Sequence, residues 1–256
     1  MMEPDELKNF LDEKYCKFNC STFIETDPIM IPRQFSRKED IEIAAFLSAT
    51  IAWGQRPTII RNANKLMQLM DGDPYAYLTQ NTNMDAERFE SFVHRTFNGI
   101  DCHYFMQALS AIYRDHGGLE KLFSDGYAVD GTVKSAITYF RERFLSFDPL
   151  HRTGKHIANP STGSSAKRIN MFLRWMVRSS GFGVDFGLWN SIPVAALMMP
   201  LDVHSGTVAR KLGLLQRTQN DWQAVEELTA NLRLFDPADP VKYDFALFGL
   251  GVFENF

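Results

Sequence analysis

The chain has few cysteines and no long apolar segment. Its 256 residues include three cysteines, Cys16, Cys20 and Cys102, which are too few and too dispersed for a disulfide framework. Cys16 and Cys20 could form half of a metal site, but no second Cys or His pair stands at a suitable spacing, so we expect no metal and no cofactor. No apolar run approaches the roughly 20 residues of a membrane span. The polar, acidic N-terminal sequence is unlike a secretory signal, and we expect a cytoplasmic protein with no membrane partner.

The chain also lacks a positive balance of charge. Its 27 Lys and Arg are outnumbered by 31 Asp and Glu, which gives a formal net charge of −4. This balance argues against a protein that coats nucleic acid without specificity, because that mode depends on bulk attraction to phosphate. A local basic strip on an enzyme stays compatible with it, since charges are screened over about 10 Å in ordinary salt.

What the chain does have is a globular composition with helical periodicity. It is 45% apolar and 23% charged, and apolar residues recur at helical spacing while period-two runs are lacking. The sequence therefore predicts an all-α protein. Helices are predicted over 7–15, 39–53, 86–95, 101–115, 131–146, 164–178, 189–198, 203–212, 220–234 and 239–250, with an irregular segment at 147–162. Asp239 is predicted to be the N-cap of the last helix, ahead of Pro240.

The segment 200–213 is the most informative part of the chain. Asp202 follows an apolar run and opens a predicted helix that Gly213 ends. An Asp at this position accepts hydrogen bonds from the N–H groups of the first turn, and these donors together with the helix dipole keep its carboxylate ionised. Asp202 is either an N-cap alone or also a catalytic carboxylate, and His204 either supports it or caps the helix.

The predicted helix 164–178 has one apolar and one cationic face. Its apolar face is formed by Ile169, Phe172, Leu173 and Met176. The opposite face carries Lys167, Arg174 and Arg178, with Arg168 at its edge. Such a cationic face is either an ordinary solvated surface or a strip that contacts a phosphate-lined substrate.

The segment Leu-Asp-Val-His-Ser-Gly-Thr-Val-Ala-Arg-Lys-Leu-Gly-Leu (201–214) resembles the segment around the catalytic Asp of helix-hairpin-helix DNA glycosylases. Segments 167–178 and 239–251 resemble a bacterial family of unknown function that is related to this superfamily. The resemblance implies one glycosylase-like unit over 1–256 with two helical lobes and a cleft between them. Lobe one would comprise approximately 1–50 plus 200–256, and lobe two approximately 51–199.

The resemblance also implies the catalytic residues. Asp202 would stabilise a cationic sugar or support attack by water, and Lys167 would form a Schiff base in the members that also cut abasic sites. Burial and cationic neighbours such as Arg168 favour the neutral amine that this role needs. The hairpin 160–167 departs from the superfamily pattern, because it lacks one Gly and Ser165 stands where the Lys is expected. The separation of Lys167 and Asp202 is closer to that in archaeal 8-oxoguanine glycosylases than in endonuclease III-like members.

Other residues are assigned to DNA by the same resemblance. Segment 46–57 resembles the helix-to-helix turn of the superfamily, where Gln55 would fill the gap left by a flipped base; the alternative is an ordinary exposed turn residue. The further expected DNA contacts are Arg56, Gly163, Ser164, Ser165, Arg168, Arg174 and His204. The expected base pocket consists of Trp53, Trp189 and Asp244, with core packing as the alternative for both tryptophans.

These residues imply a DNA repair glycosylase that cleaves the N-glycosidic bond of a damaged base, with or without abasic-site lyase activity. Two alternatives remain open: a non-catalytic nucleic-acid-binding module of the same fold, and a helical enzyme that acts on free nucleosides. The expected partner is damaged or abasic DNA, and the expected location is cytoplasmic and nucleoid-associated. We expect no iron–sulfur cluster, because the four-cysteine loop of several glycosylase relatives is absent after the last predicted helix. We also expect a monomer.

Overall fold

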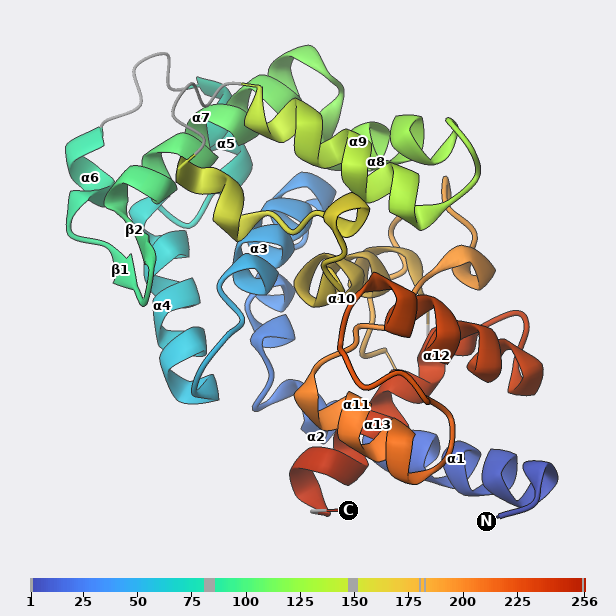
Figure 1. Ribbon diagram of the computed structural model, residues 1–256. Helices are drawn as coiled ribbons and strands as arrows, with labels where there is room; N and C mark the ends of the chain where they lie inside the picture. The colour runs from blue at the N-terminus through green and yellow to red at the C-terminus, as the bar shows by residue number, and fades with distance from the viewer. Residues whose placement is uncertain (1, 81–85, 147–151, 180, 182, 255) are drawn as a thin grey trace. The chain divides into compact units, whose positions relative to one another are not determined.

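The computed structural model describes residues 2–80, 86–146, 152–179, 181, 183–254 and 256. These residues are mostly helical, so the prediction of an all-α protein is confirmed (Figure 1). Two strands of two residues each, β1 (Val93–His94) and β2 (Phe97–Asn98), pair antiparallel. In the part of the chain that the structure describes, none of the helices is both long and apolar enough to cross a membrane.

The chain divides into two compact units. Unit 1 consists of Met1–Phe23 and Asn159–Phe256, and unit 2 consists of Ile24–Ala158. The elements of unit 1 are α1 (Pro4–Phe18), η4 (Pro160–Thr162), α10 (Lys167–Val177), η5 (Val194–Ala196), α11 (Val203–Lys211), α12 (Trp222–Phe235), η6 (Pro240–Lys242) and α13 (Tyr243–Phe253). The short helix α2 (Ser21–Ile24) spans the boundary between the two units.

Unit 2 is a bundle of short helices around one apolar helix. Its elements are η1 (Pro28–Met30), η2 (Pro32–Gln34), α3 (Lys38–Thr50), α4 (Arg56–Leu69), α5 (Pro74–Gln80), α6 (Ala86–Glu90), β1, β2, α7 (Gly99–Asp115), α8 (Gly118–Tyr127), α9 (Val133–Leu145) and η3 (Arg152–His156). Every residue of α3 from Asp40 to Thr50 is buried, including the acidic residues Asp40 and Glu42, so α3 forms the centre of this unit. On α3, Phe46 contacts the rings of Phe105, Phe140 and Phe144, which form the aromatic core of this unit.

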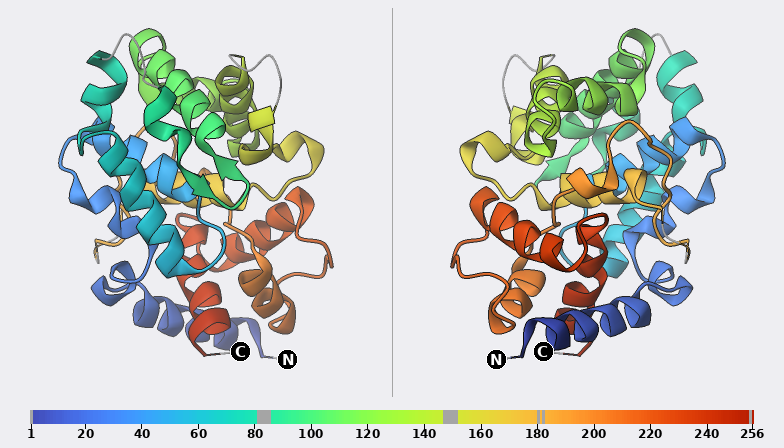
Figure 2. Two further views of the ribbon diagram at one scale, coloured as in Figure 1. Left: turned by 90° about the vertical axis from the view of Figure 1, so that its left-hand side faces the viewer. Right: turned by 90° about the vertical axis from the view of Figure 1, so that its right-hand side faces the viewer.

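In unit 1, α13 packs against both α1 and α11 (Figure 2). Its sequence is apolar on nearly all sides, and it buries most of its residues. The contact with α1 depends on glycine: a Cβ at Gly249 would lie 2.1 Å from the ring of Phe18. The helix α13 therefore forms the centre of this unit and holds α11, which carries Asp202 at its start.

Two predicted helices are wrong in extent. Residues 189–198 form only the 3-10 turn η5, because Pro193 lacks a backbone donor and disfavours helical geometry at the residue before it. The helix predicted over 86–95 ends at Glu90 and is followed by the β1–β2 hairpin, whose turn includes Arg95 in the left-handed region (φ 55°). Of the irregular segment 147–162, residues 147–151 lie outside the described residues, and the rest contains η3 and η4.

Candidate functional site

The structure brings Lys167 and Asp202 together within unit 1. Lys167 is the first residue of α10 and Asp202 is the N-cap of α11. The Lys167 Nζ lies 3.7 Å from the Asp202 Oδ2, and the two side chains are 25% and 23% exposed. Two residues that are 35 positions apart in sequence thus form one partly exposed ion pair.

The helix start explains the position of the Asp202 carboxylate. The Asp202 Oδ1 accepts hydrogen bonds from the backbone N–H groups of His204 (2.9 Å) and Ser205 (3.0 Å). The Ser205 Oγ in turn accepts a hydrogen bond from the Asp202 backbone N–H at 3.0 Å, which completes a capping box. Asp202 is therefore an N-cap through Oδ1, while Oδ2 faces the lysine. One carboxylate thus caps the helix and pairs with Lys167, and its catalytic role stays a prediction.

The hairpin before α10 sets the position of Lys167. Gly163 (φ 95°) and Ala166 (φ 48°) both adopt left-handed backbone geometry, and the Ser164 Oγ accepts a hydrogen bond from the Ala166 backbone N–H. The hairpin is tied to the start of α12, because the Gly163 carbonyl accepts a hydrogen bond from the Trp222 backbone N–H at 3.0 Å. Gly163 and Ser164 are exposed and Ser165 is half-buried, so the hairpin presents its tip to solvent.

The cationic strip expected on α10 is wrong for Arg174 and Arg178. These residues are only 3% and 1% exposed. The Arg174 guanidinium pairs with Asp185 (3.2 Å) and with Asp244. The guanidinium of Arg178 pairs with Asp185 (2.9 Å) and Asp239 (2.8 Å). Both cations are neutralised inside unit 1, so we remove Arg174 from the expected DNA contacts.

Asp239 also differs from its predicted role. It precedes Pro240 at the start of η6, but its side chain makes no cap hydrogen bond. Both of its carboxylate oxygens instead accept hydrogen bonds from the Arg178 Nε, at 3.0 and 2.8 Å. A buried guanidinium attracts the carboxylate more strongly than the N–H groups of a short turn do, because charge-assisted hydrogen bonds are the stronger ones.

Asp185 is a residue that the sequence did not reveal. Its side chain is fully buried between Arg174 in the last turn of α10 and Arg178, the C-cap of that helix. It stands in an irregular segment with no recognisable motif. Only an indirect signal for such a carboxylate is present in the sequence. Two arginines at i and i+4 need carboxylate partners from elsewhere in the chain if the helix buries both of its faces.

Asp244 lies close to the Lys167–Asp202 pair. It belongs to the first turn of α13 and is 6% exposed. Burial raises the pKa of the Asp244 carboxyl from its ordinary value of 3.8 to about 6; the charges of Arg174 and Lys167 lower it, and those of Asp202 and Asp185 raise it. The Asp244 carboxyl therefore titrates near pH 6, and its charge is coupled to those of Lys167 and Asp202.

The raised pKa of Asp244 predicts a pH-dependent stability. The folded-state pKa of about 6 exceeds the ordinary value of 3.8, so the stabilisation is complete at low pH and is lost as the pH rises through 6. We expect the free energy of unfolding to fall by about 3 kcal/mol through this one group between about pH 4 and pH 7. Asp244→Asn cannot titrate and should lack this component. Urea unfolding of both proteins across this range tests the prediction; a difference between them that is constant with pH contradicts it.

The other expected site residues of unit 1 have different environments. Arg168 is half-buried, and burial lowers its pKa to about 10, so it keeps its charge at neutral pH. His204 is exposed and contributes its backbone N–H to the Asp202 cap. Trp189 is 1% exposed and packs edge-on against Phe172. Its ring lies in the core of the unit, and its role in a base pocket stays a prediction.

Trp53, Gln55 and Arg56 belong to unit 2. Gln55 is exposed and precedes α4, with Arg56 as the first residue of that helix. Trp53 is half-buried and contacts the ring of His94 edge-on, with a centroid distance of 4.9 Å. An exposed Gln at the break between two helices has the local geometry that a wedge residue needs, and its role in DNA binding stays a prediction.

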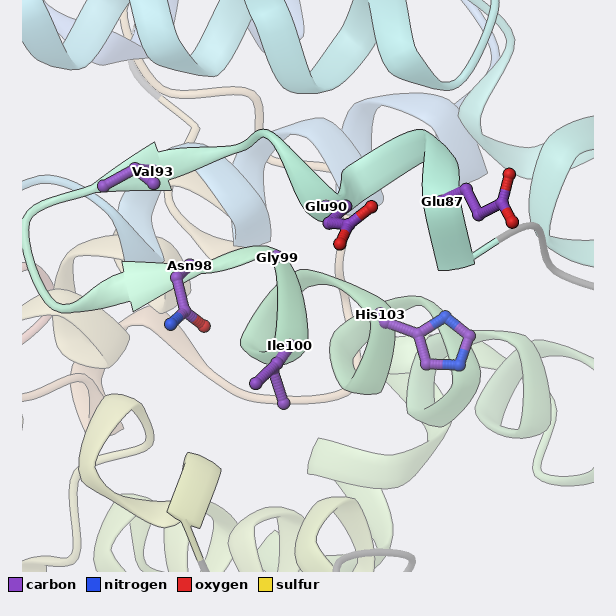
Figure 3. Close-up of a pocket in the computed structure, with 7 residues that line it drawn as sticks. All are labelled: Glu87, Glu90, Val93, Asn98, Gly99, Ile100 and His103. Carbon is purple, nitrogen blue, oxygen red and sulfur yellow. The ribbon is translucent and has the colours of Figure 1, made fainter.

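A cavity of about 650 Å³ in unit 2 contains none of the predicted site residues (Figure 3). It is lined by residues of α6, β1 and α7, and by Asn98: Glu87, Glu90, Val93, Asn98, Gly99, Ile100 and His103. Its carboxylates oppose the approach of phosphate, so the cavity is unsuited to a DNA backbone. Within the described ranges, no group of three or more His, Cys, Asp or Glu could hold a metal ion.

Comparison with known proteins gives a family. The chain belongs to the family described as "Protein of unknown function (DUF2400)", whose profile matches residues 27–253. The prediction of a family of unknown function is thereby confirmed. No curated protein and no solved structure matches the chain. The description of the family names no reaction, so the activity has to be argued from the residues.

Proposed function

We propose that this protein is a DNA glycosylase of the helix-hairpin-helix type that releases a damaged base and then cuts the abasic strand. The observation that carries the proposal is the 3.7 Å approach of the Lys167 Nζ to the Asp202 Oδ2. Both groups lie at helix starts, and the segment around Asp202 has the motif expected for the catalytic Asp. A partly exposed amine beside an anchored carboxylate suits attack on a sugar carbon that develops positive charge.

The reaction uses the two side chains in sequence. The neutral amine of Lys167 attacks C1′ of the deoxyribose, the C1′–N bond breaks, and the base leaves with the bonding electrons. Asp202, with Oδ1 fixed by two backbone N–H groups, stabilises the positive charge on the sugar through Oδ2 and accepts the proton that the lysine nitrogen loses. The departing base takes a proton from water. Asp202 returns its proton to the ring oxygen O4′ as the ring opens to a protonated Schiff base, and loss of a C2′ proton to water with elimination of the 3′-phosphate then cuts the strand.

Several surface residues support binding of DNA in this proposal. The exposed hairpin residues Gly163 and Ser164, together with half-buried Ser165, would approach a phosphate through the backbone, and Arg168 and Lys167 supply positive charge beside them. On unit 2, Gln55 is the proposed wedge, with Arg56 beside it. The substrate is damaged or abasic DNA, and the nucleoid is the proposed location.

A non-catalytic nucleic-acid-binding module is the second candidate. It is favoured by the burial of Arg174 and Arg178 in ion pairs, which removes two of the four cations expected to face the phosphates. With fewer exposed cations, electrostatic attraction contributes less to the binding of DNA phosphates. This suits a protein that recognises a DNA structure without processing it. This candidate keeps the hairpin contacts but assigns to Asp202 only its N-cap role.

Cleavage assays separate the two candidates. We expect the protein to cut duplexes that carry a single damaged base or abasic site, and to leave free nucleosides intact. Lys167→Ala should abolish both base release and strand cleavage, and Asp202→Asn should slow both by a factor of about 100 to 1000. Lys8→Ala, which removes an exposed ion pair with Asp12 on α1, serves as the matched control. Tight binding to these duplexes with neither base release nor cleavage would instead establish the binding module.

A further inference from the structure

Unit 1 contains a buried ionic network with one negative charge in excess. Arg174 is shared by Asp185 and Asp244, and Arg178 is shared by Asp185 and Asp239. Three carboxylates thus surround two guanidiniums. Since an uncompensated charge in the interior is costly, the network is stabilised when one carboxyl takes up a proton.

The position of Asp244 in the network makes it the group that best accommodates this proton. Asp185 bonds to both guanidiniums, and Asp239 receives two hydrogen bonds from Arg178 and is 24% exposed on its side chain. The Asp244 side chain is 9% exposed and pairs with Arg174 alone in the network. Its partner Arg174 lies seven residues, or two helical turns, after Lys167 on α10. The helix α13, which carries Asp244, packs against α11, which Asp202 caps. Lys167 and Asp202 also act electrostatically on the Asp244 carboxyl.

The ionisable groups around Asp244 come from several elements. Lys167 and Arg174 lie on α10, Asp185 follows α10, and Asp202 caps α11. From α1, the Tyr15 hydroxyl accepts a hydrogen bond from the Arg178 Nη2 at 2.7 Å. The groups next to Asp244 in η6 and α13 are Asp239, Lys242 and Tyr243; Lys242 pairs with Asp12 and Asp236. The exposed His204 lies in the first turn of α11.

We propose that Asp244 balances the charge of the Lys167–Asp202 pair by taking up a proton when Lys167 becomes a neutral amine and releasing it when the ammonium forms. The proton that leaves the Lys167 Nζ and the one that binds to the Asp244 carboxyl both exchange with water, so the summed charge of the site is unchanged. When Lys167 is a neutral amine, the site has lost one positive charge. Protonation of Asp244 removes one negative charge in exchange, so the buried network does not hold a second uncompensated negative charge. In this proposal Asp244 does not touch the substrate. It acts through the charge of Lys167 and is therefore a positioning residue.

The proposal predicts opposite effects of two substitutions on one titration. Lys167→Met removes a positive charge near Asp244 and should raise the pKa of its carboxyl, whereas Asp202→Asn removes a negative charge and should lower it. We expect each shift to be about one pH unit, a usual effect of one neighbouring charge on the pKa of a carboxyl. The measurement is the side-chain carboxyl ¹³C shift of Asp244 against pH in the full-length protein. Lys121→Met, which breaks an exposed ion pair with Asp125 in unit 2, is the matched control and should leave the titration unchanged.

The outcomes are decisive whether or not the protein acts on DNA. Shifts of opposite sign in Lys167→Met and Asp202→Asn support the proposal. Equal shifts, shifts of the same sign, or a pKa of Asp244 near its ordinary value in the wild-type protein overturn it. Amide spectra of each variant show whether it is folded, and Asp239→Asn tests whether the other end of the network holds the proton instead.

The consequence for catalysis rests on the proposed function. If the glycosylase reaction is confirmed, the pH profile of kcat should have an inflection near 6 that disappears in Asp244→Asn. Retention of this inflection in the variant contradicts the charge-balancing role. Absence of any DNA activity would refute the proposed function and leave the carboxyl titration as the test of the coupling.

Discussion

Asp202→Asn is expected to lower the rate of base excision by a factor of about 100 to 1000, the usual effect of removing one preorganised charge or donor from a transition state. The substitution keeps an oxygen in place of Oδ1, so the hydrogen bonds from the His204 and Ser205 N–H groups can persist. It removes the negative charge that faces Lys167 at 3.7 Å. The loss should therefore appear in kcat, with little change in stability.

The control for this experiment is a carboxylate that caps another helix start. Asp73 accepts a hydrogen bond from the Ala76 backbone N–H at the start of α5 and lies in unit 2. Asp73→Asn should leave excision unchanged. Excision at the wild-type rate by a folded Asp202→Asn protein would show that Asp202 is an N-cap alone, and the enzymatic interpretation would have to be abandoned.

Arg174→Met is expected to lower the free energy of unfolding by about 3–5 kcal/mol, because removing one partner of a buried ion pair leaves the other charge uncompensated. Asp185 and Asp244 both lose a partner, although Asp185 keeps Arg178. The guanidinium also lies over the Phe245 ring at 4.3 Å from its centroid. Methionine retains most of the apolar stem, so the loss measured by urea unfolding reports mainly on the charge.

Two further variants show whether the stability lost in Arg174→Met comes from the buried charge. Lys8→Met breaks an exposed ion pair within α1 and should cost less than about 1 kcal/mol. Combining Arg174→Met with Asp244→Asn removes both the cation and the carboxylate that it leaves unpaired, and should recover part of the stability. A cost for Arg174→Met as small as that of Lys8→Met would contradict the buried network.

The sequence predicted the local structure of the site well, because that structure depends on short-range chemistry. Asp202 after an apolar run, with Gly213 to end the helix, is enough to predict α11, and the apolar spacing of Ile169, Phe172 and Leu173 is enough to predict α10. The structure contains both helices, at Val203–Lys211 and Lys167–Val177.

The partners of the cations could not be predicted in the same way. Helical periodicity places Arg174 and Arg178 opposite an apolar face, but burial of both faces depends on which other segments cover the helix. Asp185, Asp239 and Asp244 come from segments with no pattern linking them to α10. The expected phosphate strip was wrong for Arg174 and Arg178 for this reason. The sequence pattern of an arginine is the same whether its side chain faces solvent or a buried carboxylate.

The most direct measurement is reduction with borohydride of the wild-type protein in the presence of DNA that contains one abasic site, followed by mass spectrometry of the peptides. We predict a stable adduct between the deoxyribose and the Lys167 Nζ, which forms at the rate of strand cleavage and is lost in Lys167→Ala. An adduct at another lysine, or strand cleavage that continues in Lys167→Ala, would contradict the central role of this amine beside Asp202.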